Sequence, residues 1–231
     1  MEMTNKLGNN IFTISYYEYF LSLALKQGYE FCTLNEYILK GYPNKKHFII
    51  RHDIDLNPIT LKKQLKIESK LGISSTNFVR IAGAKYNFLN YPILKMLLDA
   101  ESNGHEIGLH TNYVEFSKIL NLNKNKILNN EINILKKFFN VKGIAPHRDL
   151  NYCYNSLPDI ELNWDSIKSN NQIEYHAYDS KILNNTVYIN EGFNPHLCWR
   201  LHKPEEIIPT GDSIYLLTHN HWWYDDYPFE D

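Results

Sequence analysis

Short apolar runs alternate along the chain with longer stretches in which apolar residues recur every three to four positions. The runs predict buried strands, because each is only a few residues long and ends at polar side chains. The longer stretches have the period of amphipathic helices. We expect strands at 47–50, 76–81, 106–110, 143–146 and 213–218, with a weaker β-like piece at 186–189.

Helix start and stop signals lie between these strands. Asn57 and Pro58 are typical of the N-cap and first position of a helix, and Gly72 is typical of its end. Gly104 closes a second predicted helix at 92–102. The long Asn- and Lys-rich segment after the third strand predicts further helical structure.

The alternation of strands and helices predicts an α/β fold with a parallel sheet. An open doubly wound sheet and a barrel both satisfy it. We favour a (β/α) barrel, because polar residues stand at the carboxyl ends of at least four strands, as expected where one mouth gathers a site. Residues 1–45, with predicted helices at 16–26 and 34–39, form a helical lead-in, and residues 46–231 form the barrel.

Charge and composition argue against a nucleic-acid partner and against a membrane-spanning segment. The chain has 24 Lys and Arg against 26 Asp and Glu, and no basic block, so we expect no nucleic-acid partner. No apolar run approaches the roughly 20 residues of a membrane span. No export signal is visible, which predicts a cytoplasmic protein. The arginines are few: Arg51, Arg80, Arg148 and Arg200.

Two aspartates follow the first predicted strand, in the sequence Arg51-His52-Asp53-Ile54-Asp55. One residue separates them, so on extended backbone their side chains point the same way and lie close together. Two like charges so close favour a bound cation, which takes one carboxylate as a ligand and leaves the other free as a base. The alternative is that both carboxylates cap the next helix, where anions are favoured.

Histidines stand at the ends of three other strands. His110 ends the third strand, His147 follows the fourth together with Arg148, and His219 follows the last. A lone strand-end histidine is more often structural, but beside an Asp pair it becomes a candidate metal ligand or general acid. The guanidinium of Arg148 suits a carboxylate or an oxyanion, with an ordinary salt bridge as the alternative.

Two tryptophans close this last motif, His219-Asn220-His221-Trp222-Trp223. Their flat faces suit sugar rings, and packing at the end of the barrel is the alternative for both. Trp222 is the better candidate for a sugar contact.

These segments resemble the polysaccharide deacetylase superfamily, also called NodB-homology domains or carbohydrate esterase family 4. The resemblance rests on the order and spacing of residues 51–55, 104–110 and 217–223, and it spans roughly residues 45–224. The RHD-x-D form with a terminal LTH-x-x-WW is similar to a branch found with surface-polysaccharide and O-antigen assembly genes. The resemblance implies a distorted (β/α) barrel, a divalent metal at its mouth, and hydrolysis of an N-acetyl group on a sugar.

The resemblance also implies individual roles. Asp53 maps onto the general base, Asp55 onto a metal ligand, His219 onto the general acid and Arg148 onto the arginine of the third motif. Arg148 would hold Asp53 ionised or steer an anionic part of the substrate.

The predicted set of metal ligands departs from the family pattern at one position. The second motif has two histidine ligands, and here His110 is present while Val114 takes the place of the other. We hypothesise that His147 completes the set from the neighbouring strand end. Asp55, His110 and His147 are borderline ligands that suit Zn, with Co, Fe and Ni as alternatives.

Together these assignments predict a metal-dependent hydrolase that removes an acetyl or formyl group from a sugar in surface-polysaccharide biosynthesis. Without an export signal, a nucleotide sugar or lipid-linked glycan is favoured over finished cell-wall polymer. Val114 motivates the alternative of a catalytically inactive barrel that binds a sugar or glycan intermediate. A hydrolase of phosphoesters or cyclic amides is a third candidate, although two-metal sites commonly gather more ligands than are found here.

Overall fold

The structure is a computed structural model of the chain. For residues 114, 115 and 118 it describes only the backbone. The described residues are 12–147 without 82 and 84, together with 168, 172–191 and 198–225.

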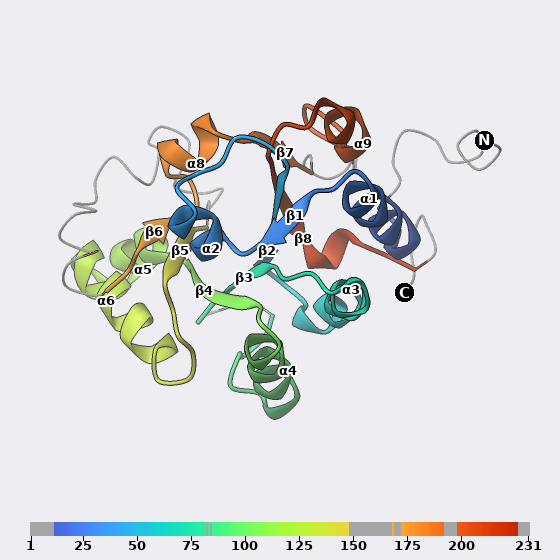
Figure 1. Ribbon diagram of the computed structural model, residues 1–231. Coiled ribbons are helices and arrows are strands. Elements are labelled where there is room, and N and C mark those ends of the chain that lie inside the picture. The colour runs from blue at the N-terminus through green and yellow to red at the C-terminus, as the bar shows by residue number, and fades with distance from the viewer. Residues whose placement is uncertain are drawn as a thin grey trace.

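Within these described ranges, eight strands form one parallel sheet, in the order β6-β5-β4-β3-β2-β8-β7, with β1 paired to the first half of β2. The sheet curls into part of a barrel with helices around it (Figure 1), which confirms the predicted distorted (β/α) barrel. The strands are β1 (Glu30–Cys32), β2 (His47–Ile54), β3 (Thr76–Val79), β4 (Glu106–Thr111), β5 (Gly143–Pro146), β6 (Tyr175–His176), β7 (Val187–Asn190) and β8 (Ile214–His219).

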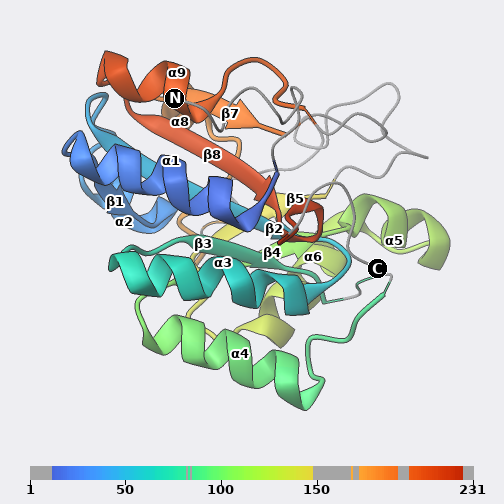
Figure 2. The ribbon, with the colours of Figure 1, turned by 90° about the vertical axis from the view of Figure 1, so that its right-hand side faces the viewer.

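Helices α1, α3 and α4 lie side by side along the outside of the sheet (Figure 2). None of the helices within the described ranges is long and apolar enough to cross a membrane. The helices are α1 (Ile14–Lys26), α2 (Leu34–Leu39), α3 (Pro58–Leu71), α4 (Tyr91–Ser102), α5 (Tyr113–Leu120), α6 (Lys124–Leu135), α8 (Ser180–Asn184) and α9 (Pro204–Ile207), with 3-10 turns η2 (Ile208–Thr210) and η3 (Asn220–Trp222).

Helix α3 begins and ends where the sequence predicts. The Asn57 side chain accepts a hydrogen bond from the backbone N–H of Ile59 at 3.1 Å, and Pro58 occupies the first turn. Gly72 ends the helix with a φ of 67°, a conformation that costs glycine little. Because Asn57 provides the cap, the alternative in which the two aspartates cap this helix is wrong.

Three element predictions differ from the structure. Strand β2 continues through Arg51–Ile54, so the charged motif lies inside a strand and not after it. Strands β1 and β6 are missing from the predictions, because three and two residues are too few to show a period. The Asn- and Lys-rich segment forms two helices, since Asn121 adopts a left-handed conformation with a φ of 49° and ends α5.

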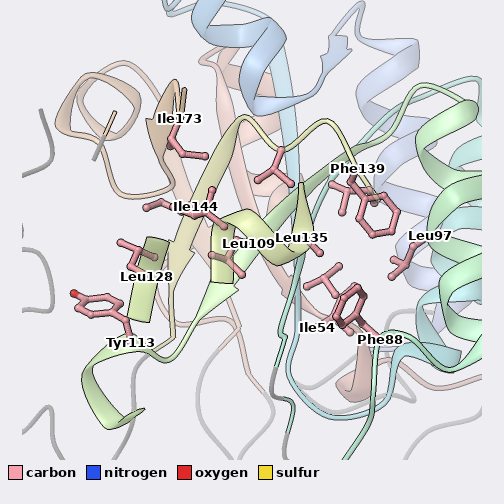
Figure 3. Close-up of a cluster of buried hydrophobic side chains, with 14 of the residues drawn as sticks. Ile54, Phe88, Leu97, Leu109, Tyr113, Leu128, Leu135, Phe139, Ile144 and Ile173 are labelled. Carbon is pink, nitrogen blue, oxygen red and sulfur yellow. The ribbon is translucent and has the colours of Figure 1, made fainter. Parts of the chain in front are cut away.

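Alternate residues of the strands build an outer core. Ile54, Val79, Leu109 and Ile144, from four neighbouring strands, pack in one cluster with Leu97 of α4 and with residues of α6 (Figure 3). Because side chains alternate along a strand, the neighbours of Ile54 in β2 point to the inside of the barrel. The outer core therefore orients Asp53 and Asp55 inward.

The barrel interior at the amino ends of the strands is mostly apolar, with the buried pair Thr76 and Glu106 as its polar part. Ile49 and Phe78 of the inner face pack with Leu34 and Tyr37 of α2, all of them fully buried. Helix α2 thus closes this end of the barrel. The inward residues that come later along β2 are polar, and they line the opposite end.

Candidate active site

The strand register brings the predicted site residues to one end of the barrel. Asp53 pairs with His219 on β8, and His110 pairs with Ala145, two residues before His147. Residues that pair across parallel strands share a face of the sheet, so these side chains converge from β2, β4, β5 and β8.

The three predicted metal ligands lie together. Oδ1 of Asp55 is 3.1 Å from Nε2 of His110 and 3.5 Å from Nε2 of His147. One ligand atom from each of the three residues lies within 4.8 Å of the other two. A divalent cation can therefore contact all three after small side-chain adjustments, with positions left open for water or substrate.

The chemistry of this cluster fits a metal ion. Nδ1 of His110 lies 2.8 Å from the carbonyl oxygen of Ala145, so Nδ1 donates to that oxygen and Nε2, which faces Asp55, is the nitrogen that would bind a cation. Oδ1 of Asp55 is buried and accepts no hydrogen bond from any described residue. Burial acts to raise the pKa of Asp55, but the neighbouring imidazoles hold that pKa well below its ordinary value. The carboxylate is therefore ionised, and its free oxygen is available to a cation.

Asp53 is held by an arginine of its own strand. Nε and one terminal nitrogen of Arg51 donate to the two oxygens of Asp53, each at 2.7 Å. Tyr178 contacts the guanidinium from a ring centroid 4.5 Å away. Burial acts to raise the pKa of Asp53, but Arg51 and then His110 hold it below 3.8. Arg51 is two positions before Asp53, so on a strand their side chains lie on the same face, as those of Asp53 and Asp55 do.

His219 has a buried carboxylate partner that the sequence did not suggest. Nδ1 of His219 lies 2.8 Å from Oε2 of Glu191, whose other oxygen accepts a hydrogen bond from the indole of Trp223 at 2.5 Å. Nε2 of His219 faces Oδ2 of Asp55 at 3.7 Å. Burial lowers the pKa of His219, but Glu191 and then the two aspartates raise it to about 9. In the metal-free protein the imidazole is therefore protonated at neutral pH, as a general acid requires.

The two tryptophans differ in their surroundings. Trp223 is 1% exposed and packs edge-on against Phe12 and Tyr17, so the packing interpretation holds for it. Trp222 is half-buried, and its ring centroid is 4.4 Å from that of His219. Trp222 thus lies beside the candidate acid, where a sugar contact is possible.

A second polar cluster lies behind the site, on the outer face of β2. His52 is 2.7 Å from Glu68 of α3 through Nε2 and 2.6 Å from the hydroxyl of Thr218 through Nδ1. Tyr17 and Ser75 also donate to Glu68, at 2.5 and 2.7 Å. His52 and Thr218 directly precede Asp53 and His219, so the cluster fixes the two strands that carry the candidate base and acid.

Two residues of the sequence predictions cannot be placed in this site. Arg148 lies outside the described residues, and its proposed contact with Asp53 stays a prediction. Residue 114 lies in α5, and nothing further is described of its side chain.

Comparison with known proteins identifies no family. No family profile matches the chain, and no curated protein is similar to it. Two bacterial deacetylase structures are similar at low identity. Streptococcus pyogenes deacetylase PplD, in complex with acetate, is 17% identical, with 62% of this chain and 68% of that chain covered and a TM-score of 0.46. Peptidoglycan deacetylase PdaC from Bacillus subtilis, as the mutant D285S, is 15% identical, with 76% and 89% covered and a TM-score of 0.42.

Proposed function

We propose that this protein is a metal-dependent hydrolase that removes an N-acyl group, acetyl or formyl, from a sugar. The convergence on Asp55 of two imidazoles and a candidate acid supports this proposal above all. His110 and His147 approach one oxygen of Asp55, and His219 approaches the other. A site that only bound sugar would not require a buried, ionised carboxylate among three imidazoles.

Asp55, His110 and His147 are the residues that would hold the metal, with Zn favoured and Co, Fe or Ni possible. When bound there, such a cation supplies Lewis acidity toward the acyl carbonyl and lowers the pKa of a water molecule.

The proton transfers belong to the protein. Asp53 is ionised, and its two hydrogen bonds from Arg51 fix its orientation, so it accepts the proton of the attacking water. His219 donates a proton to the departing amine, and Glu191 stabilises the imidazolium before that step. Trp222 stacks on the sugar beside the scissile bond, and Arg148 steers an anionic part of the substrate.

The substrate is proposed to be a nucleotide sugar, a lipid-linked glycan or an oligosaccharide intermediate of surface-polysaccharide assembly in the cytoplasm. The motif form at residues 51–55 and 217–223 supports the link to polysaccharide assembly.

The test is release of acetate or formate from a panel of N-acylated amino sugars, offered free, nucleotide-linked and as oligosaccharides. Metal-loaded protein is expected to turn over at least one member of the panel. The variant His219→Gln is expected to lose about 10²- to 10⁴-fold in kcat, the usual contribution of a positioned acid. His202→Gln changes an exposed histidine and serves as the matched control. Metal-loaded protein that turns over nothing, with a bound sugar still detected, would support the inactive barrel instead.

A further inference from the structure

Arg80 stands in the same row of the barrel as two of the candidate metal ligands. Val79 pairs with Ile54 on β2 and with Leu109 on β4, so the residues that follow these three are Arg80, Asp55 and His110. Arg80 follows Phe78 by two positions, and Phe78 lies inside the barrel. Strand β3 therefore carries a cation to the end of the barrel where its neighbours carry metal ligands.

Arg80 is a buried cation that forms no salt bridge with any residue that the structure describes. Arg80 is 7% exposed, and its Nε is buried and donates no hydrogen bond. No carboxylate of the described residues lies within 4.0 Å of it, whereas Arg51 is paired with Asp53. A buried charge without a partner is costly, because its lost hydration is not replaced. An external anion would remove that cost.

The position of Arg80 is fixed by a tyrosine. The backbone N–H of Arg80 donates to the hydroxyl of Tyr86 at 2.8 Å, and that hydroxyl donates to the carbonyl oxygen of Ile54, also at 2.8 Å. Ile54 directly precedes Asp55. The start of the β3–α4 connection is thus tied to the backbone beside the metal centre.

A nearby carboxyl group inside the protein compensates the charge of Arg80 only in part. Glu131 is 6% exposed and accepts a hydrogen bond from Thr111 at 2.5 Å. Burial raises the pKa of Glu131 to about 7, although the charge of Arg80 acts in the opposite direction. Glu131 is thus only partly ionised near neutral pH, and no salt bridge joins it to Arg80 among the described residues.

A cavity lies beside Tyr86, the residue that holds the backbone of Arg80. The cavity has a volume of about 630 Å³, and its lining includes Leu56, the residue after Asp55. Its lining includes Lys85 and no carboxylate, and the other polar groups are amides and the imidazole of His221. Two cations, Lys85 and Arg80, therefore lie on one connection next to the candidate active site.

We propose that Arg80 binds an oxyanion of the substrate, a phosphate or a carboxylate group, beside the metal centre. This deepens the proposed function, because it restricts the substrate to acylated amino sugars that carry such a group. The anion site itself can be tested without any turnover.

The experiment is isothermal titration of chelator-treated, metal-free protein with inorganic phosphate and, separately, with acetate, at constant ionic strength. The wild type is expected to bind at least one of them saturably, and the tighter one identifies the anion class. Arg80→Gln is expected to weaken that binding tenfold or more. Arg80→Lys is expected to lie between the two, because lysine keeps the charge but loses the two-pronged donor geometry. Arg200→Gln, at an exposed arginine, serves as the matched control and is expected to bind like the wild type.

Two results would overturn the proposal: no saturable binding by the wild type, or equal binding by the wild type and Arg80→Gln. If Arg80→Gln fails to fold, Arg80→Lys decides, since binding equal to that of the wild type contradicts a role for the guanidinium fork. Failure of the hydrolase proposal would leave these titrations unchanged, so the two proposals can fail separately.

Discussion

Arg51 and Asp53 form a two-pronged ion pair within a single strand, with both hydrogen bonds at 2.7 Å. Their side chains are 0% and 3% exposed. The charge that keeps the proposed base ionised therefore comes from the strand that carries it. The orientation of Asp53 depends on β2 itself and not on a loop.

This pair predicts a strong energetic coupling. Asp53→Asn leaves a buried guanidinium without its counter-charge, so we expect it to lower the free energy of unfolding by about 3–5 kcal/mol. Arg51→Met is expected to cost a similar amount by isolating the carboxylate. The double variant is expected to cost less than the sum of the two single variants, by about 1–3 kcal/mol. Urea unfolding of the four proteins measures this coupling, and strict additivity would contradict it.

Metal binding is expected to depend on His147 as well as on His110. Zinc at 100 times its dissociation constant should stabilise the wild type by about 2.7 kcal/mol, measured by thermal unfolding. His147→Gln and His110→Gln should each weaken zinc binding by at least about 10-fold, by analogy with other perturbations of metal sites. His202→Gln is the control for the loss of an imidazole. If His147→Gln binds zinc like the wild type, the third ligand lies elsewhere in the chain.

The basic limb of the pH profile tests the partnership of His219 and Glu191. A general acid must be protonated, so kcat should fall as the pH rises through the pKa of His219. Glu191 raises that pKa, which reaches about 9 in the metal-free protein. Glu191→Gln should therefore move the basic limb to lower pH. A bound cation lowers the pKa in both proteins, so the difference between their limbs is the quantity to compare. A limb at the same pH in both would contradict the assignment of Glu191.

The position of a site residue could be predicted from sequence where that residue lies at the end of a strand. Asp55, His110, His147 and His219 each lie at or just beyond a strand end, and parallel strands bring such ends together. Their partners were not predictable in the same way. Glu191 is 28 positions from His219, and only the pairing of β7 with β8 brings them together.

The polar cluster of His52 and Glu68 on the outer face of β2 was not predicted, for a related reason. Glu68 appears in the sequence as one more charged position of an amphipathic helix, 16 residues from His52. Whether such a residue faces solvent or the sheet depends on how α3 lies on β2, and a helical period alone does not give that angle. The sequence pattern predicts which side chains lie at the barrel mouth. Which residues hydrogen-bond to them or to their strands depends on how the helices and strands pack.

Glu68 should make the protein sensitive to acid. Burial acts to raise its pKa, but His52, and then His105 and Tyr17, lower it from 4.5 to about 2. The folded state thus binds this proton less readily than the unfolded chain. The stabilisation is present above about pH 4.5 and is lost as the pH falls toward 2, and it amounts to about 3 kcal/mol for a shift of this size.

The comparison is between the wild type and Glu68→Gln. At pH 7 the variant should unfold more easily, and the difference in unfolding free energy should shrink by about 3 kcal/mol as the pH approaches 2. Glu174→Gln removes an exposed carboxylate and should show a far smaller change. Chemical unfolding at several pH values measures all three proteins. A difference between wild type and Glu68→Gln that does not vary with pH would mean that Glu68 contributes by packing and hydrogen-bond geometry, without its charge.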